Sequence, residues 1–372
     1  MGPALRRIGL INDTSVTGNP GCAAVCRTIE GVAAALGGRI AARLPVGYWA
    51  EPFKTMAAQP KDCTVKRPDS FPVGSTAAPP IDLAVWQSIC AELEGTDENL
   101  RAFLESCDLV IVNGEGSIHH NFRRSLALLA LMHVMGRHGR PFMLVNSTIQ
   151  AMQPELLRLV LPTAVHRHVR EDCSRDYLSS LSIDSHSGPD LAFHSIGDLA
   201  FEPQTGRQGC LVTAGVLSGE SALRALFASV RDCGLEPSYL CIGDGGERPL
   251  AERVCASENV PLAHAAELSL EDLLRYLGGF QVAISGRHHI NMYLMRAGVP
   301  FLPLPSNTWK VEGALRQVGY PVPIVHEVSQ LPARLASVHE QRDDLGERCA
   351  ESFARGTSGV SRVIGELVES AS

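Results

Sequence analysis

Basic side chains follow two apolar runs in the second half of the chain. Ser285, Arg287 and His289 come directly after the run Val282–Ile284, and Lys310 follows the next such run. Guanidinium and ammonium groups bind the oxygens of carboxylates and phosphates, and an imidazole exchanges protons near neutral pH. We therefore expect these residues to form the floor of an anion-binding cleft in which proton transfer takes place.

A carboxylate flanked by two glycines lies in the segment Asn113–Asn121, after another apolar run. We expect the glycines to turn the backbone sharply and to place Glu115 in the cleft as a general acid or base. Ser117, His119 and His120 are candidates for binding a phosphate or orienting an acceptor. The alternative is that Glu115 caps the following helix and that the histidines lie in a solvated loop.

Two further polar segments follow apolar runs in the first half of the chain. After Ile8–Ile11, small polar residues lead into a helix whose free amide groups favour an anion. The candidates in this segment are Asn12, Asp13, Asn19 and Gly21. After Ala164–Val169, Arg170 and Ser174 stand at a strand end and a helix start. Ordinary turn formation and helix capping are the alternative in both segments.

The elements that must position these residues are strands that alternate with amphipathic helices. This alternation predicts an α/β fold with parallel sheets, and ligands bind such sheets beyond the carboxyl ends of the strands. The predicted strands are Ile8–Ile11, Leu109–Val112, Phe142–Val145, Ala164–Val169, Cys210–Thr213, Tyr239–Ile242, Val282–Ile284 and Phe301–Leu304. We therefore expect two Rossmann-like domains.

The length of 372 residues also favours two domains. The polar, turn-rich stretch 202–209 is predicted to link them. The expected units are an N-terminal Rossmann-like domain over 1–200 with a Pro-rich insertion at about 54–80, a C-terminal Rossmann-like domain over 201–345, and a C-terminal helix within 346–372. We expect this last helix to pack back on the first domain.

Composition excludes some classes of protein. The net charge of −7 and the absence of a Lys/Arg run argue against a nucleic-acid-binding protein. The eleven cysteines show no metal-ligand spacing and are expected to be reduced and buried. Because no signal-like or membrane-spanning run is present, we expect a cytoplasmic protein. Peripheral membrane contact and a homo-oligomer stay open.

Taken together, these motifs resemble those of the polysaccharide pyruvyl transferase family. The family's C-terminal signature (a strand, S-x-R-x-H, an apolar helix ending in G-x-P, a strand and a lysine) is matched by Ser285, Arg287, His289, Gly298, Pro300 and Lys310. Two other family patterns are matched by Asn12, Gly18, Asn19 and Gly21, and by Arg170, Ser174, Pro189 and Asp190, with Glu171 in place of the usual Asp. The chain departs from the family at Gly114–Ser117, where members usually carry three consecutive glycines.

The resemblance implies a GT-B-like arrangement with an interdomain cleft, and a transferase that moves pyruvate from phosphoenolpyruvate onto two sugar hydroxyls as a cyclic ketal. Arg287 and Lys310 would then hold the anionic donor, with Arg170 as a third cation. His289 would act as general acid or base, and Glu115 or Asp13 would complete the proton transfers. The expected partners are this small donor and a carbohydrate acceptor, with no metal and no cofactor.

Two other functions stay open at the level of sequence. The first is a glycosyltransferase that uses a nucleotide sugar of the sialic-acid or Kdo type, with Glu115 as the base for the acceptor hydroxyl. In that case the stretch Gly243–Gly246 would touch the nucleotide. The second is a non-catalytic protein that binds carbohydrate or anions. The presence of Arg287, His289 and Lys310 together argues against this last function.

Overall fold

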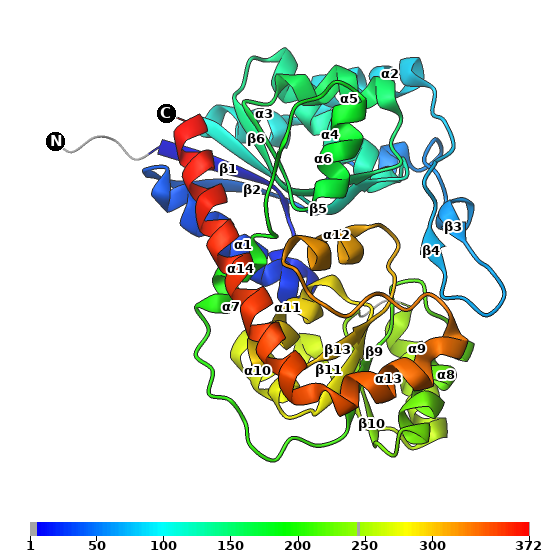
Figure 1. Ribbon diagram of the computed structural model, residues 1–372. Coiled ribbons are helices and arrows are strands. Elements are labelled where there is room, and N and C mark those ends of the chain that lie inside the picture. Colours follow the sequence, from blue (N-terminus) through cyan, green and yellow to red (C-terminus); the bar gives the residue numbers. More distant parts are fainter. Residues whose placement is uncertain (1–5, 244–245, 372) are drawn as a thin grey trace.

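The computed structural model describes residues 6–243 and 246–371, which form two α/β units stacked end to end (Figure 1). Each unit is built on a sheet in which all neighbouring strands are parallel. The predicted α/β fold with two Rossmann-like domains is therefore confirmed. Among the described residues, no helix combines the length and the apolar character that crossing a bilayer requires.

The first unit holds a six-stranded sheet. Its strands are β1 (Arg6–Asp13), β2 (Gly38–Pro45), β5 (Leu109–His119), β6 (Phe142–Gln150), β7 (His166–Val169) and β8 (His186–Ser187), and a separate hairpin consists of β3 (Thr64–Val65) and β4 (Val73–Gly74). Its helices are α1 (Pro20–Ala35), α2 (Leu83–Thr96), α3 (Glu98–Ser106), α4 (Arg123–Arg137), α5 (Pro154–Val160), α6 (Asp172–Ser180) and α7 (Ala192–Gly197). The strand order is β2-β1-β5-β6-β7-β8.

The second unit holds a five-stranded sheet. Its strands are β9 (Cys210–Thr213), β10 (Pro237–Cys241), β11 (Leu262–His264), β12 (Val282–Ser285) and β13 (Phe301–Pro303). Its helices are α8 (Glu220–Asp232), α9 (Glu247–Glu258), α10 (Leu270–Gly278), α11 (His288–Ala297) and α12 (Lys310–Gln317), followed by α13 (Leu331–Glu340) and α14 (Arg342–Ser370). The order is β11-β10-β9-β12-β13. Each of the eight predicted apolar runs overlaps a strand, because strands buried on both faces consist of continuous apolar residues.

Three neighbouring strands of the first sheet carry a bulge. Asn12 in β1, Glu115 in β5 and Asn146 in β6 have positive φ angles of 62°, 37° and 58°, and each lies at a shift in strand pairing. The expectation that the glycines around Glu115 turn the chain out of the strand is wrong, because β5 continues to His119. Glu115 does not cap α4 either, since the N-cap residue there is Phe122.

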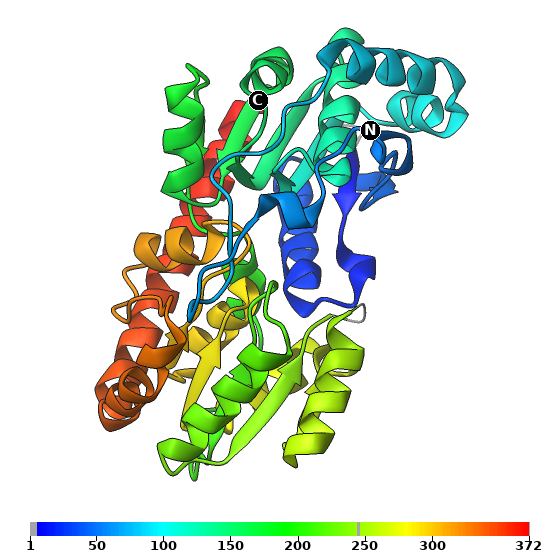
Figure 2. The same cartoon turned by 90° about the vertical axis from the view of Figure 1, so that its right-hand side faces the viewer.

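The Pro-rich insertion connects the two units. Phe71 is buried in the core of the second unit, and its backbone N–H donates to the His326 carbonyl at 2.8 Å. The Val328 N–H donates in turn to the Asp69 carbonyl at 2.8 Å. Figure 2 shows this segment running from the first unit across the junction to the second. The segment predicted as a loop of the first domain is thus a strap between both units.

Helix α14 lies along both units and ends beside the first strand (Figure 1). At its end, Arg6 Nη1 donates to the Ala371 carbonyl at 3.0 Å, and His166 Nδ1 lies 2.9 Å from Ser370 Oγ. Gly359 brings the helix against Pro189, because a Cβ at position 359 would lie 2.6 Å from Pro189 Cγ. The C-terminal helix therefore packs on the first unit through a close contact that leaves no room for a side chain.

Replacing Gly359 by alanine tests this contact. We expect Gly359→Ala to lower the free energy of unfolding by about 1–3 kcal/mol, because the added methyl group overpacks the interface. Gly365 in the same helix has nothing within 4 Å of the corresponding position. Gly365→Ala should therefore raise stability by about 0.5–1 kcal/mol. Urea unfolding measures both variants, and equal stability of the two would contradict the close contact.

Candidate active site

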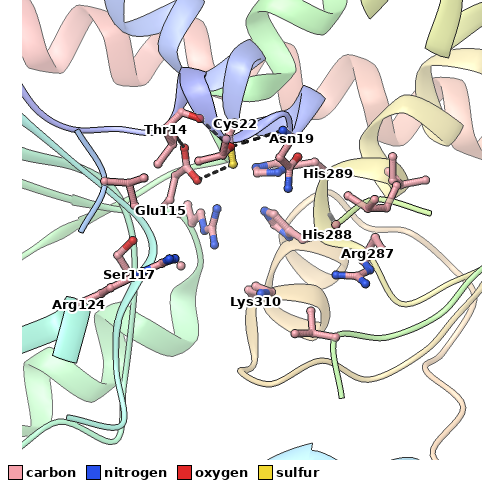
Figure 3. A pocket seen from close by; sticks show the side chains of 18 residues that line it. Thr14, Asn19, Cys22, Glu115, Ser117, Arg124, Arg287, His288, His289 and Lys310 are labelled. Carbon is pink, nitrogen blue, oxygen red and sulfur yellow. Dashed lines mark hydrogen bonds between the residues drawn. The ribbon is translucent and has the colours of Figure 1, made fainter. Parts of the chain in front are cut away.

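A cavity of about 360 Å³ lies between the two units, at the carboxyl ends of strands from both sheets. It is lined by seven of the residues predicted from the sequence, namely Asn19, Glu115, Ser117, Arg170, Arg287, His289 and Lys310. Figure 3 shows Arg287, His288, His289 and Lys310 on one side of this cavity and Glu115, Ser117 and Arg124 on the other. The two units thus contribute different chemistry: the second supplies Arg287, Lys310 and both histidines, whereas the first supplies the Glu115 carboxylate together with Arg124 and Arg170.

Four cationic side chains line the cavity: Arg124, Arg170, Arg287 and Lys310. Arg287 forms an ion pair with Glu247, and Arg170 donates from Nη1 to Asp190 Oδ2 at 2.7 Å. Lys310 donates from Nζ to the side-chain oxygen of Asn307 at 2.9 Å. Burial, together with the charges of Arg170 and Arg287, lowers the pKa of Lys310 to about 7. An anion between these groups would relieve their mutual repulsion.

The carboxylate of Asp190 connects the two units at the floor of the cavity. Its Oδ2 accepts hydrogen bonds from Arg170 and, at 3.0 Å, from His288 Nε2, and it lies 3.6 Å from His289 Nε2. Its Oδ1 accepts the backbone N–H of Ala192 at 2.8 Å. Burial opposes ionisation, but Arg170 and the two histidines hold the pKa of Asp190 well below its usual value. Asp190 therefore stays ionised and orients three basic side chains.

Glu115 is held on the opposite wall by three donors. Thr14 Oγ1 donates to its Oε1 at 2.5 Å and Asn113 Nδ2 to the same oxygen at 2.9 Å, while Cys22 Sγ donates to Oε2 at 3.1 Å. These bonds fix the carboxylate at the cavity without an ion pair. A carboxylate in this position can accept a proton from a hydroxyl group bound in the cavity.

A glycine at the start of α1 allows two groups of the site to approach one another. A Cβ at Gly21 would lie 2.1 Å from the ring of His289, so that only glycine lets α1 begin against this histidine. The side chain of Asn19 caps α1 by accepting the Gly21 N–H at 3.0 Å. The predicted residues Asn19 and Gly21 thus shape the site through the helix start.

Asn12 and Asp13 were predicted at the site, but they lie beneath the cavity rather than along its lining. Asn12 donates from Nδ2 to the Asn113 carbonyl at 2.6 Å and to Ser117 Oγ at 3.1 Å. Asp13 is buried and forms an ion pair with Arg43 at 3.0 Å. In this structure Asn12 supports the bulge of β5, and Asp13 faces α1 and β2.

Ser174 and Ser285 also use their hydroxyl groups within the protein. Ser174 is fully buried, receives the Ile149 N–H at 2.8 Å and donates to Glu171. Ser285 Oγ accepts the backbone N–H of Arg287 at 3.4 Å. Neither lies along the cavity, because each is turned toward the backbone that it supports. Burial raises the pKa of Glu171 to about 7, so this carboxyl also belongs to the buried network.

The two histidines after Glu115 lie beside the main cavity. His119 Nδ1 and His120 Nδ1 are 2.7 Å apart, and His120 Nε2 lies 2.6 Å from the Ser75 carbonyl oxygen. Burial lowers the pKa of His119 well below its usual value, which favours the neutral ring, although the Gly116 carbonyl acts in the opposite direction. His119 lines a second cavity, whereas His120 lies behind it and is tied to the insertion.

Sequence reasoning missed several lining residues, among them Thr14, Cys22, Arg124 and His288. Thr14 and His288 lie next to predicted residues, so their segments were found but their orientation was not. Cys22 and Arg124 carry no local signal, since each is one of many residues of its type on a helix. Asp190 was noted as part of a motif, and only the fold places it under both histidines.

Asp190, His288 and His289 offer ligand atoms that lie within 4.8 Å of one another. Such a group could hold a metal ion. However, the Arg170 guanidinium donates to the same Asp190 oxygen at 2.7 Å, and its positive charge opposes a cation there. The expectation that the protein needs no metal stays a prediction.

Comparison with known proteins gives the family. A family profile described as polysaccharide pyruvyl transferase matches residues 43–308. This chain belongs to the polysaccharide pyruvyl transferase family. The match includes Glu115, Arg170, Asp190, Arg287 and His289, whereas the N-terminal motif and Lys310 lie outside it. No curated protein matches the sequence significantly.

Solved structures share the fold. The UDP-GlcNAc 2-epimerase from Neisseria meningitidis bound to UDP-GlcNAc has a TM-score of 0.59 at 11% identity, covering 98% of this chain and 100% of the other. The structure of S. aureus MnaA with UDP has a TM-score of 0.58 at 14% identity, covering 98% of this chain and 96% of the other. Os79 from O. sativa in complex with UDP has a TM-score of 0.56 at 10% identity, covering 98% of this chain and 100% of the other. At such identities the similarity shows the GT-B-type fold of this family member and nothing about its ligand.

Replacing Asp190 by asparagine tests its role as the connection between the units. We expect Asp190→Asn to lower the free energy of unfolding at pH 7 by about 3–5 kcal/mol, because Arg170 loses its buried counter-charge. Because folding lowers the pKa of Asp190, its ionised carboxylate stabilises the fold fully above the pKa of an unfolded Asp, about 4. This stabilisation is lost as the pH falls below that value toward the lower pKa of the folded state. The difference between wild type and variant should therefore shrink from pH 7 to pH 3 in urea unfolding. The exposed Asp198→Asn is the control, and a difference independent of pH would contradict the assignment.

Proposed function

We propose that this protein transfers pyruvate from phosphoenolpyruvate to two hydroxyl groups of a saccharide, forming a cyclic ketal in cytoplasmic bacterial glycan biosynthesis. One observation carries the proposal: Arg287 and Lys310 lie with His289 on one side of a cavity whose other side presents Glu115, and Arg170 lines the same cavity. Family membership supports this choice of reaction. The proposal makes phosphoenolpyruvate a substrate and requires no metal or cofactor.

The cations match the two anionic groups of the donor. The phosphate and carboxylate of phosphoenolpyruvate would lie between Arg287, Lys310 and Arg170, where charge-assisted hydrogen bonds are strong. This placement would bring the enol carbon atoms toward His289. As negative charge collects on the departing phosphate, the same groups stabilise it without rearranging, because Asp190 already holds Arg170 and the Glu247 carboxylate holds Arg287.

The chemistry balances with two proton-transfer groups. Protonated His289 would give a proton to the methylene carbon, while the first hydroxyl oxygen bonds to the central carbon and passes its proton to Glu115. The bond from the central carbon to the phosphate oxygen then breaks. The second hydroxyl oxygen bonds to that carbon and returns a proton to His289, and Glu115 passes its proton to the released phosphate. The products are the ketal and inorganic phosphate.

A glycosyltransferase reaction with a nucleotide sugar is the second candidate. Ile242 and Gly243 line the cavity from the second unit, as the sequence interpretation for a nucleotide required. The remainder of that stretch includes Asp244 and Gly245, which lie outside the described residues. In this case Glu115 would deprotonate the acceptor hydroxyl and Arg287 would bind the phosphate groups.

Thermal unfolding with ligands distinguishes the two candidates. A ligand that binds the native state raises the melting temperature in proportion to the logarithm of its concentration. We expect phosphoenolpyruvate to raise it and UDP-GlcNAc, CMP-sialic acid and CMP-Kdo to leave it unchanged. Arg287→Ala should abolish the effect, and Arg101→Ala on the exposed surface of α3 is the control. Stabilisation by a nucleotide sugar alone would overturn the proposal in favour of the second candidate.

The pH dependence of donor binding tests the role of Lys310. A phosphate monoester is fully ionised above about pH 7, so that further change reports on the protein. Because the pKa of Lys310 is lowered to about 7, the ammonium form that binds the anion disappears between pH 7 and 9. We expect the affinity for phosphoenolpyruvate to fall at least about tenfold over this range. Calorimetric titration of Lys310→Arg should show a flat profile, and an equally steep profile in that variant would contradict the assignment.

A further inference from the structure

A second cavity of about 610 Å³ adjoins the first and lies between the strap and α4. The two cavities share Gly116, Ser117 and Arg124 as a common wall. A volume of this size accommodates a small organic ligand. If the first cavity holds the donor, as the proposed function requires, the adjoining space is where an acceptor can reach it across the shared wall.

The second cavity is strongly basic. Lys54, Arg123 and Arg124 line it. The exposed carboxylate of Glu51 bridges Lys54 at 2.9 Å and Arg123 at 3.0 Å. Across the described residues no carboxylate pairs with Arg124. One carboxylate against three cations leaves the cavity with a net positive charge.

The backbone adds to this charge. The 15-residue helix α4 begins at Arg123 and has no side-chain cap among the described residues, so its first amide groups contribute partial positive charge at this end of the cavity. The rings of Phe122 and His119 lie edge to face at 4.9 Å and line the same space. His119 is buried, and its Nδ1 lies 2.7 Å from His120 Nδ1. The cavity thus combines apolar ring surface, a buried polar group and excess cations.

We infer that this second cavity is the acceptor site and that it selects a saccharide carrying an anionic group, either a carboxylate or a phosphate. Arg124 on the shared wall, with Lys54 and Arg123, binds the anionic group, and the rings of Phe122 and His119 contact the sugar. This inference rests on the proposed function only where it identifies the bound saccharide as the acceptor substrate. The specificity for an anionic saccharide follows from the charges of the cavity itself.

Calorimetric titration of the full chain with glucuronate, glucose 1-phosphate and glucose tests the inference. Saturating phosphoenolpyruvate is present, so that the first cavity is occupied. We expect at least one anionic sugar to bind at least about tenfold more tightly than glucose. Whichever anionic sugar binds more tightly shows whether the site prefers a carboxylate or a phosphate. Equal binding of all three sugars would overturn the inference.

Variants then locate the site. Lys54→Ala with Arg123→Ala changes side chains that line only the second cavity, so it should weaken the anionic sugar about tenfold or more and leave phosphoenolpyruvate binding unchanged. Arg124→Ala should weaken the anionic sugar as well, whereas Arg101→Ala is the control without effect. Unchanged sugar binding in both test variants would refute the site. If the wild-type protein binds the anionic sugar but does not bind phosphoenolpyruvate, the proposed donor is refuted and the basic sugar site is retained.

Discussion

The buried carboxylate of Asp190 is the interaction on which the site depends. It belongs to the first unit, yet it accepts a hydrogen bond from His288 of the second and lies close to His289. A carboxylate without solvent is tolerated only when cations and donors surround it. The pairing with Arg170 of the same unit meets this requirement, and the hydrogen bond with His288 joins the first unit to the second. The cavity therefore has a defined shape because one charge needs partners from both sides.

The cavity that results is rich in positive charge before any ligand binds. Arg170 and Arg287 have carboxylate partners, whereas within the described part of the chain Lys310 donates only to the Asn307 amide oxygen. Burial and the charges of the two neighbouring arginines lower the pKa of Lys310 to about 7. Such an arrangement stores unfavourable electrostatic energy that an anion releases. Further contacts also join the units, since α14 packs on elements of both and the strap buries Phe71 in the core of the second.

The bulges within β1, β5 and β6 explain how the first unit presents its side chains. A regular strand would alternate its side chains between the two faces of the sheet. The left-handed residues Asn12, Glu115 and Asn146 interrupt this alternation at the edge that faces the second unit. Glu115 thereby reaches the cavity while β5 remains paired with β6 on both sides of the bulge. Positive φ at non-glycine residues costs energy and is common at functional sites.

The sequence by itself determined most strands of both sheets, although not β2, β8 and β11, and it identified the segments that form the site. Apolar runs long enough for buried strands were visible, and the carboxyl ends of parallel strands must share an edge, which places Glu115 and Arg170 at one edge of the first sheet and Arg287 at the matching edge of the second. Only the tertiary structure decided which polar side chains face the cavity. Asp13 and Ser174 carry polar groups that suit a site as Glu115 does, but their side chains are engaged elsewhere. Asp13 forms an ion pair with Arg43, and Ser174 Oγ accepts the Ile149 N–H. The sequence also did not predict the strap, the role of Asp190 or the contact of Gly21 with His289. Each depends on partners distant in the chain, and local residue patterns carry no information about such partners.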